Sequence, residues 1–220
     1  VSEMYEHYLR ENIAVVTCNK IACASSSQNY NILKNVSRKS NVPFLYETNV
    51  GAGLPIIDTL KNLIASGDRV HKIQAVLSGS LNFVFNKFNS STTFCSIVQQ
   101  AEKEGFTEPD PKIDLSGIDV ARKILILARE SGYEIELEDI VNNSFLSKES
   151  LATKTNTDFY ASLDKNEPHF QQLLSEANKQ DCRLKYVAEF ENGKASVGLQ
   201  HITRSHSFYN LEGSDNIVLF

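Results

Sequence analysis

The first 50 residues of this 220-residue chain contain no glycine. Loops that wrap the main chain around a phosphate need glycine, because only glycine lets the backbone approach a ligand so closely. This absence excludes a glycine-rich phosphate-binding turn from residues 1–50. The chain also contains no Gly-x-Gly-x-x-Gly turn, no P-loop and no Gly-x-Ser-x-Gly turn elsewhere.

Other absences narrow the class of protein further. No apolar run approaches the roughly 20 residues that cross a bilayer, and the N-terminus does not resemble a secretory signal. The four cysteines, at 18, 23, 95 and 182, fit neither a disulfide framework nor zinc spacing. We expect buried free thiols, no membrane and a cytoplasmic, reducing compartment. The 22 basic and 27 acidic residues give a net charge of −5, which argues against nucleic acid as a partner.

The N-terminal region shows the pattern of a parallel sheet with a crossover helix. The apolar run Ile13–Thr17 predicts a strand buried on both faces, a helix is predicted over 27–39, and Phe44–Thr48 predicts a second strand. Strand, helix and strand in this order form a βαβ unit, so we expect an α/β fold here.

Beyond residue 50 the pattern changes to mixed helices and strands. The predicted helices cover 55–66, 83–88, 92–104, 114–130 and 168–179, and the predicted strands cover 71–77, 185–190, 194–202 and 216–220. Asn192-Gly193, between two alternating runs, predicts a β-hairpin. We interpret 133–158 as loops with short helices, and this region as an α+β part with antiparallel strands.

The segment Gly105–Lys123 is acidic and stiffened by two prolines. A helix would place Asp119 and Lys123 on one face. One interpretation is a solvated loop followed by a surface ion pair of little energy. The other is a site for an amino-bearing substrate, in which carboxylates bind an ammonium group and Asp119 keeps Lys123 charged until it moves a proton. Lys20 follows the first strand, where ligands of open α/β sheets bind, although it also fits an exposed loop.

Two further segments combine small residues with a chemical group. Glu47 precedes Gly51 and Gly53, whose backbones allow carbonyls to turn outward, so the segment fits either a hard cation or a plain strand-to-helix turn. Gly79 and Ser80 follow the strand 71–77 and fit either a ligand contact or an ordinary turn.

Together these segments resemble homoserine dehydrogenase, most closely the dehydrogenase half of bifunctional aspartokinase–homoserine dehydrogenases. The segments that carry the resemblance stand in the family's order: Val15–Lys20, Tyr46–Ile57, Ser78–Asn82 and Gly105–Lys123. The likeness weakens beyond 130, where His206–Asn216 resembles a late family motif. Phe106 departs from the family, which commonly has tyrosine there.

The resemblance implies interconversion of L-homoserine and L-aspartate 4-semialdehyde with NADP or NAD, a step toward threonine and methionine. It assigns the general acid/base to Lys123, its partner and a substrate contact to Asp119, and the place between nicotinamide and substrate to Lys20. Glu108 would bind the substrate amino group, and the remaining pocket residues are Asp114, Gly79 and Ser80. A structural sodium-like cation would be held by Glu47 and by carbonyls of Val50, Ala52 and Leu54.

The resemblance also predicts the organisation of the chain. Residues 1–48 would be the C-terminal part of an incomplete Rossmann-type nucleotide domain, and 49–220 an α+β substrate-binding, catalytic and dimerisation domain. The family's cofactor turn and its final segment are missing, so we expect a fragment, inactive alone, of a homodimer or larger homo-oligomer. The alternatives are a non-catalytic regulatory or scaffolding module and another amino-aldehyde dehydrogenase on this scaffold.

Overall fold

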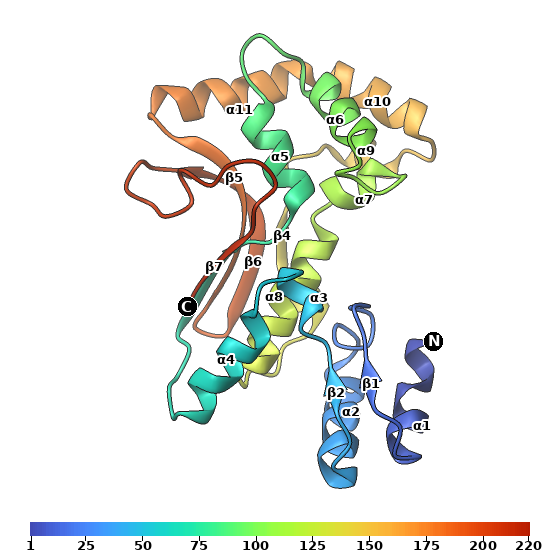
Figure 1. Ribbon diagram of the computed structural model, residues 1–220. Coiled ribbons are helices and arrows are strands. Elements are labelled where there is room, and N and C mark those ends of the chain that lie inside the picture. The colour runs from blue at the N-terminus through green and yellow to red at the C-terminus, as the bar shows by residue number, and fades with distance from the viewer.

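A computed structural model describes residues 1–220, and its N-terminal part is a small α/β unit (Figure 1). Strands β1 (Val15–Val16) and β2 (Phe44–Leu45) pair in parallel, with α2 (Ser27–Ser40) as the crossover. The βαβ prediction is therefore confirmed. The prediction of a strand buried on both faces is wrong: Val16 is 77% and Leu45 50% exposed. Helix α2 covers the buried face, and no element described here covers the other.

Local sequence explains where the crossover helix begins and ends. The Ser26 hydroxyl accepts a hydrogen bond from the Asn29 N–H, which caps the N-terminus of α2. Asn41 ends the helix in the left-handed conformation. A short 3-10 turn (Ser2–Met4) and α1 (Tyr5–Arg10) precede β1, and α1 packs beside α2.

The rest of the chain is built on a mixed five-stranded sheet. Its order is β4-β6-β5-β3-β7, and the strands are β3 (Lys72–Val76), β4 (Val141–Asn143), β5 (Arg183–Glu191), β6 (Lys194–Ile202) and β7 (Ile217–Leu219). The predicted hairpin is confirmed, because Asn192 and Gly193 both have the positive φ of a type I′ turn. Strand β4 was not predicted: its three exposed residues show no apolar pattern, and it exists through parallel pairing with β6.

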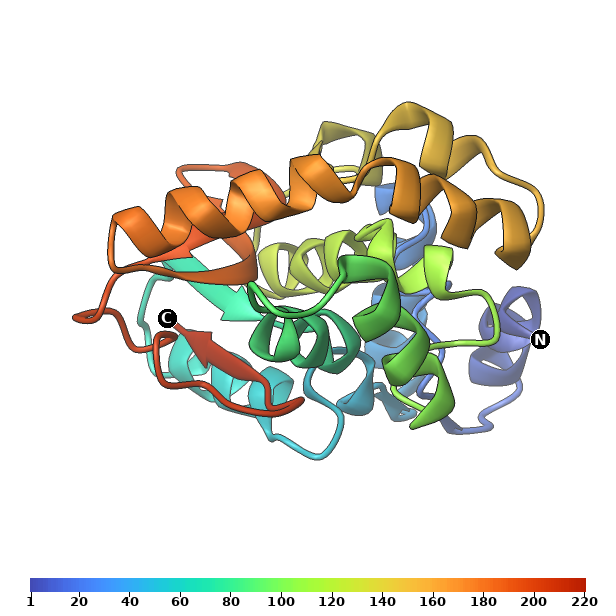
Figure 2. The same ribbon diagram turned by 90° about the horizontal axis from the view of Figure 1, so that it is seen from above.

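Helices cover one face and one end of this sheet (Figures 1 and 2). They are α3 (Thr48–Gly51), α4 (Ile56–Ala65), α5 (Gly79–Lys87), α6 (Phe94–Lys103), α7 (Pro111–Leu115), α8 (Ile118–Glu130), α9 (Lys148–Ala152), α10 (Asn156–Lys165) and α11 (Glu167–Lys179), with a 3-10 turn at Leu137–Asp139. Figure 1 shows α8 between the sheet and the N-terminal unit. One buried cluster of 51 residues runs through both parts of the chain.

The helix predicted over 114–130 is in fact two helices, α7 and α8, which meet at Ser116 and Gly117. Gly117 has φ +75, and a Cβ there would lie 1.9 Å from the Tyr186 hydroxyl. The conformation and the close approach both require glycine, so the chain turns at this residue and α8 starts anew. The apolar periodicity of 114–130 did not reveal the break.

Three of the four cysteines are buried free thiols, as predicted, whereas Cys18 is exposed. Burial, together with the nearby Glu130 charge, raises the pKa of Cys23 to about 12. None of the helices combines the length and the hydropathy that a bilayer span requires.

A polar cluster joins the N-terminal unit to the last turn of α8. The Glu130 carboxylate, 3% exposed, accepts hydrogen bonds from the Tyr30 and Tyr46 hydroxyls and from Lys34 at 3.1 and 3.2 Å. Burial opposes ionisation, but Lys34 and the two hydroxyls hold the pKa of Glu130 below its usual value. The cluster therefore stabilises the fold at pH values above the pKa that Glu130 has in the unfolded chain. This stabilisation is lost as the pH falls through the lower pKa that Glu130 has in the folded protein.

We expect Glu130→Gln to lower the free energy of unfolding by about 1–3 kcal/mol at neutral pH, because an amide replaces the charged acceptor of three donors. Urea unfolding followed by circular dichroism measures the change. The difference from the unaltered protein should shrink in acid, where Glu130 is itself protonated. A loss of equal size at neutral and acidic pH would contradict this account of the cluster.

Candidate active site

Lys20, Asp119 and Lys123 form one charged cluster. The Lys20 ammonium lies 3.2 Å from one carboxylate oxygen of Asp119, and the Lys123 ammonium lies 3.1 Å from the other. Lys20 comes from the loop after β1, whereas Asp119 and Lys123 come from α8. The structure therefore brings Lys20, at the carboxyl end of a parallel strand, to two predicted site residues that lie about 100 positions further along the chain.

Geometry on α8 sets the relation between the aspartate and the second lysine. Asp119 and Lys123 are one turn apart, as the sequence predicts, and the apolar side of α8 is packed into the core. Lys123 also donates to the Leu77 carbonyl at 2.7 Å, and its side chain is 15% exposed. This carbonyl, at the end of β3, orients the ammonium and could not be recognised from sequence, because it carries no side-chain signal.

Burial and charge act in opposite directions on this cluster. Burial would raise the pKa of Asp119, but the charges of Lys123 and Lys20 outweigh it and hold that pKa below its ordinary value. Burial lowers the pKa of Lys123, and the Asp119 charge offsets only part of this. The expectation that Asp119 simply keeps Lys123 charged is thus incomplete: the site combines a permanent carboxylate with a lysine that releases its proton more easily than usual.

Ser80, Asp114 and Glu108 form a second polar group. The Ser80 hydroxyl donates to the Phe106 carbonyl at 2.6 Å and to Asp114 at 2.9 Å, and the other Asp114 oxygen accepts from the Glu108 N–H at 2.8 Å. Burial raises the pKa of Asp114, although its hydrogen bonds to the Glu108 N–H and Ser80 oppose the rise. The Asp114 carboxylate thus fixes the loop that carries Glu108.

Two local features prepare this group for a ligand. Ser78 caps α5 by accepting from the Leu81 N–H at 3.2 Å, which places Gly79 and Ser80 in the first turn of that helix. The Thr107 hydroxyl, beside Glu108, is buried and has no hydrogen-bond partner. A buried donor without a partner is costly, so this hydroxyl is consistent with a polar ligand at the loop. Phe106 stacks on Phe83 with ring centroids 4.2 Å apart.

Asp110 is not part of either group. Its carboxylate accepts from the Lys112 N–H at 3.1 Å and caps α7. Of the four acidic residues in the Gly105–Lys123 segment, Asp110 therefore has a structural role as the N-cap of α7, with Pro111 at the first position of that helix. Asn49, which sequence reasoning missed, is fully buried. With its amide oriented so that the nitrogen faces the Thr17 and Cys18 carbonyls, Asn49 donates to both, at 3.1 and 3.0 Å. It holds the loop that leads to Lys20.

The loop after α3 has the backbone that a cation site needs. Ala52 has φ +51 and ψ −112, a strained conformation for a residue with a side chain. The Val50 and Ala52 carbonyls accept no backbone hydrogen bond, whereas the Leu54 carbonyl accepts one from Ile56. Carbonyls of this kind fit a hard monovalent cation.

The Glu47 carboxylate binds two backbone N–H groups at the start of α4. Its two carboxylate oxygens accept from the Ile57 N–H at 2.7 Å and the Asp58 N–H at 2.8 Å, at the start of α4. The carboxylate caps this helix. Its remaining lone pairs still allow it to contact a cation together with the carbonyls of the loop.

Comparison with known proteins gives a consistent family. The model of the family "Homoserine dehydrogenase" matches residues 55–220. The bifunctional aspartokinase/homoserine dehydrogenase of Haemophilus influenzae is 39% identical over 220 residues, which are 100% of this chain and 27% of the relative. The homoserine dehydrogenase of Schizosaccharomyces pombe is 37% identical over 228 residues, which cover 100% of this chain and 61% of the relative.

A solved structure supports the same fold. The structure of a hyperthermophilic archaeal homoserine dehydrogenase in complex with NADPH superposes on this chain with a TM-score of 0.73 and 26% sequence identity. The match covers 99% of this chain and 57% of the archaeal chain. The mixed α/β architecture with a Rossmann-type N-terminal part is thus shared with solved relatives. The chain spans about a quarter of the bifunctional relatives and under two thirds of the others described here.

Proposed function

This chain belongs to the homoserine dehydrogenase family, and on that basis we propose that the protein interconverts L-homoserine and L-aspartate 4-semialdehyde with NADP or NAD. The observation that carries the proposal is the Lys20–Asp119–Lys123 cluster beside the Ser80–Asp114–Glu108 group. A carbonyl reduction needs a proton donor where the alkoxide develops, and the first group provides it. An amino-acid substrate needs carboxylates around its ammonium group, and the second group provides them.

Each residue has a distinct role in this proposal. Lys123 gives its proton to the carbonyl oxygen during reduction and takes it back from the homoserine hydroxyl during oxidation. Its lowered pKa suits both directions, because a general acid/base works best when its pKa is near the operating pH. Asp119 orients Lys123 and contacts the substrate, and Lys20 lies between the substrate and the nicotinamide, which supplies hydride transfer when bound.

The substrate amino group would be bound by Glu108, with Asp114, Gly79 and Ser80 forming the rest of the pocket. Asp114 already accepts from Ser80 and from the Glu108 N–H, so its contribution is to hold the loop in place. Holding the reacting groups at fixed positions is a large part of what the protein contributes to such a reaction.

We also propose a structural cation and a homo-oligomer. The cation would be held by Glu47 and the carbonyls of Val50, Ala52 and Leu54, a donor set of oxygens only. Residues 1–48 would serve the nucleotide and 49–220 the substrate and a homodimer or larger assembly. The reaction would take place in the cytoplasm, as a step of threonine and methionine biosynthesis.

The 220-residue chain alone should have no useful turnover. None of its ten glycines stands in a Gly-x-Gly-x-x-Gly turn, which is the usual cradle of a dinucleotide diphosphate. We expect this chain to bind NADPH about 100-fold more weakly than the protein as its gene encodes it. This factor corresponds to a loss of about 2.8 kcal/mol of binding free energy, at about 1.4 kcal/mol for each factor of ten. Fluorescence titration with NADPH measures this, and homoserine oxidation within tenfold of the encoded protein would contradict it.

Substrate comparison separates the rival functions. The encoded protein should oxidise L-homoserine with NADP or NAD, and it should prefer homoserine to amino alcohols one carbon shorter or longer. A preference for another amino alcohol would indicate a different amino-aldehyde dehydrogenase. A folded protein that oxidises none of them would indicate a regulatory or scaffolding module instead.

A further inference from the structure

Lys185, in β5, the first strand of the hairpin, is a charged residue buried without an acidic partner. Its relative exposure is 0%, and no carboxylate forms an ion pair with it. The ammonium donates instead to the Asn82 side-chain oxygen at 2.9 Å, to the Asn86 side-chain oxygen at 2.6 Å and to the Leu211 carbonyl. All three of its N–H groups therefore have partners, although none of them carries a charge.

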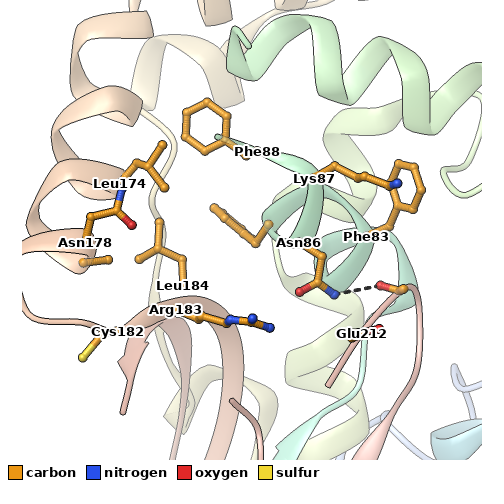
Figure 3. Close-up of a pocket in the computed structure, with 13 residues that line it drawn as sticks. Phe83, Asn86, Lys87, Phe88, Leu174, Asn178, Cys182, Arg183, Leu184 and Glu212 are labelled. Atoms are coloured by element: carbon orange, nitrogen blue, oxygen red, sulfur yellow. Dashed lines mark hydrogen bonds between the residues drawn. The ribbon is translucent and has the colours of Figure 1, made fainter. Parts of the chain in front are cut away.

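The two asparagines relay this contact to the segment between β6 and β7. Asn82 and Asn86 are one turn apart on α5, and their side-chain nitrogens point to this segment. The Asn82 nitrogen donates to the Asp215 carbonyl at 3.0 Å, and the Asn86 nitrogen donates to the Leu211 and Gly213 carbonyls at 3.2 and 3.0 Å. Figure 3 shows the bond from Asn86 to Gly213 as a dashed line.

Apolar packing holds the first part of this segment, because Phe208 lies in a small buried cluster that Tyr209 and Leu211 also contact. Residues 203–216 form turns and irregular backbone, with Phe208 as their fully buried side chain. Beside these hydrogen bonds, α5, α11 and β5 border a cavity of about 470 Å³, and Arg183 and Glu212 are among the residues that line it. Residues 212–216 contribute no side chain to the apolar cluster, so the polar contacts from Asn82 and Asn86 hold this part of the segment.

The same segment lies against the first turn of α5, which carries Gly79 and Ser80. A Cβ at Gly79 would lie 3.0 Å from the Ser214 carbonyl oxygen. Ser80 in turn donates to Asp114. A continuous path of contacts thus leads from Lys185 through the segment to the proposed substrate pocket.

We propose that Lys185 is a positioning residue, whose ammonium acts through Asn82 and Asn86 to clamp residues 211–215 onto α5 and so fixes the Gly79–Ser80 end of the substrate pocket. Burying the Lys185 charge costs desolvation free energy, which an apolar side chain at the same position would avoid. Packing of the core alone therefore does not explain a lysine here. A fully satisfied polar network instead specifies one arrangement of the segment. This inference rests on the proposed function for its kinetic consequence, but the clamp itself does not.

The clamp should respond to alkaline pH. Burial and the nearby Arg183 charge, opposed by Glu212, together lower the pKa of Lys185 to about 8. Above this pH the neutral amine has only two N–H donors for three acceptors, so one contact is lost. The lysine is charged and the clamp complete below about pH 8.

The test compares Lys185→Met with Lys194→Met in the protein as its gene encodes it. Lys194 is an exposed lysine at the start of the neighbouring strand. We expect Lys185→Met to raise the KM for homoserine about tenfold with a smaller change in kcat, because it disturbs binding before the chemical step. The unaltered protein should show a rise of KM above about pH 8, and Lys185→Met should not. Lys194→Met should behave as the unaltered protein does.

Hydrogen exchange tests the clamp without catalysis. The amides of 211–216 should exchange about tenfold faster in Lys185→Met, because a lost buried hydrogen bond makes local opening easier by about this factor. If Lys185→Met does not fold, Asn86→Ala is the second test, because it retains the hydrogen bond between Lys185 and Asn82. In Asn86→Ala the same amides should also exchange faster, by a smaller factor. Unchanged exchange and an unchanged KM in the folded variant would overturn the proposal. Absence of homoserine oxidation in the unaltered protein, with faster exchange in the variant, would overturn only the proposed function.

Discussion

Replacing Lys123 with methionine should lower kcat for homoserine oxidation by about 10³-fold, because loss of a positioned general acid/base typically costs 10²–10⁴. Lys123 is the group of the cluster with the lowest exposure, and its ammonium is oriented twice, by Asp119 and by the Leu77 carbonyl. Methionine has a similar shape and fills the same space without a proton to transfer. The KM for homoserine should change much less than kcat, as expected when an interaction of the transition state is removed.

Lys103→Met is the matched control for this experiment. Lys103 is an exposed lysine in the last turn of α6 and contacts neither charged group of the site. Steady-state kinetics of both variants, with circular dichroism to confirm folding, separate chemistry from stability. A folded Lys123→Met protein with kcat within tenfold of the unaltered protein would show that another group transfers the proton.

Replacing Asp119 with asparagine should lower kcat/KM by about 10²-fold and also move the pH dependence of oxidation. The carboxylate orients two lysines at 3.1 and 3.2 Å, and an amide cannot accept from both with charge assistance. The effect on rate is smaller than for Lys123, because the reacting ammonium remains. The magnitude follows from the loss of one oriented, charge-assisted pair, which is worth roughly 1.5–3 kcal/mol.

The direction of the pH shift follows from the charges. Oxidation needs the neutral amine of Lys123, so the rate rises as the pH passes the pKa of Lys123. The negative charge of Asp119 raises that pKa against the effect of burial. Without this charge, burial and Lys20 lower the pKa further, and the rising limb of the pH profile should move to lower pH.

Asp110→Asn provides the control for the pH profile. Asp110 belongs to the same acidic segment but caps α7, a role that asparagine also performs. Its pH profile should match that of the unaltered protein. A rising limb that stays in place or moves to higher pH in Asp119→Asn would mean that Asp119 does not set the pKa of the catalytic group.

Patterns of residue types predicted the elements of the fold well where they were periodic and capped. The crossover helix and the Asn192-Gly193 hairpin follow from apolar spacing and turn chemistry alone. Strand β4 did not, because its three residues are exposed and their conformation depends on pairing with β6. The break at Gly117 depends on the position of Tyr186, which is distant in sequence, so no local pattern contains it.

The candidate site was predictable in its side chains and not in its backbone contacts. Lys20, Asp119 and Lys123 were found by their chemistry and by family resemblance, and the structure places them in one cluster. Two supporting contacts carry no chemical signal in the sequence: the Leu77 carbonyl orients Lys123, and the Asn49 amide lies against the loop that leads to Lys20. The opposing effects of burial and charge on Lys123 depend on packing, so the sequence indicated only the charge.

Transfer of deuterium from labelled substrate tests the central proposal most directly. The protein as its gene encodes it would be incubated with L-homoserine carrying deuterium on C4 and with NADP or NAD. Oxidation of the C4 hydroxymethyl group to an aldehyde should move one deuterium to the nicotinamide ring, which mass spectrometry detects, while the hydroxyl proton goes to Lys123. The same protein with Lys123→Met should form almost no labelled cofactor. A folded protein that binds the cofactor but yields no deuterated nicotinamide from this substrate would contradict the proposed function.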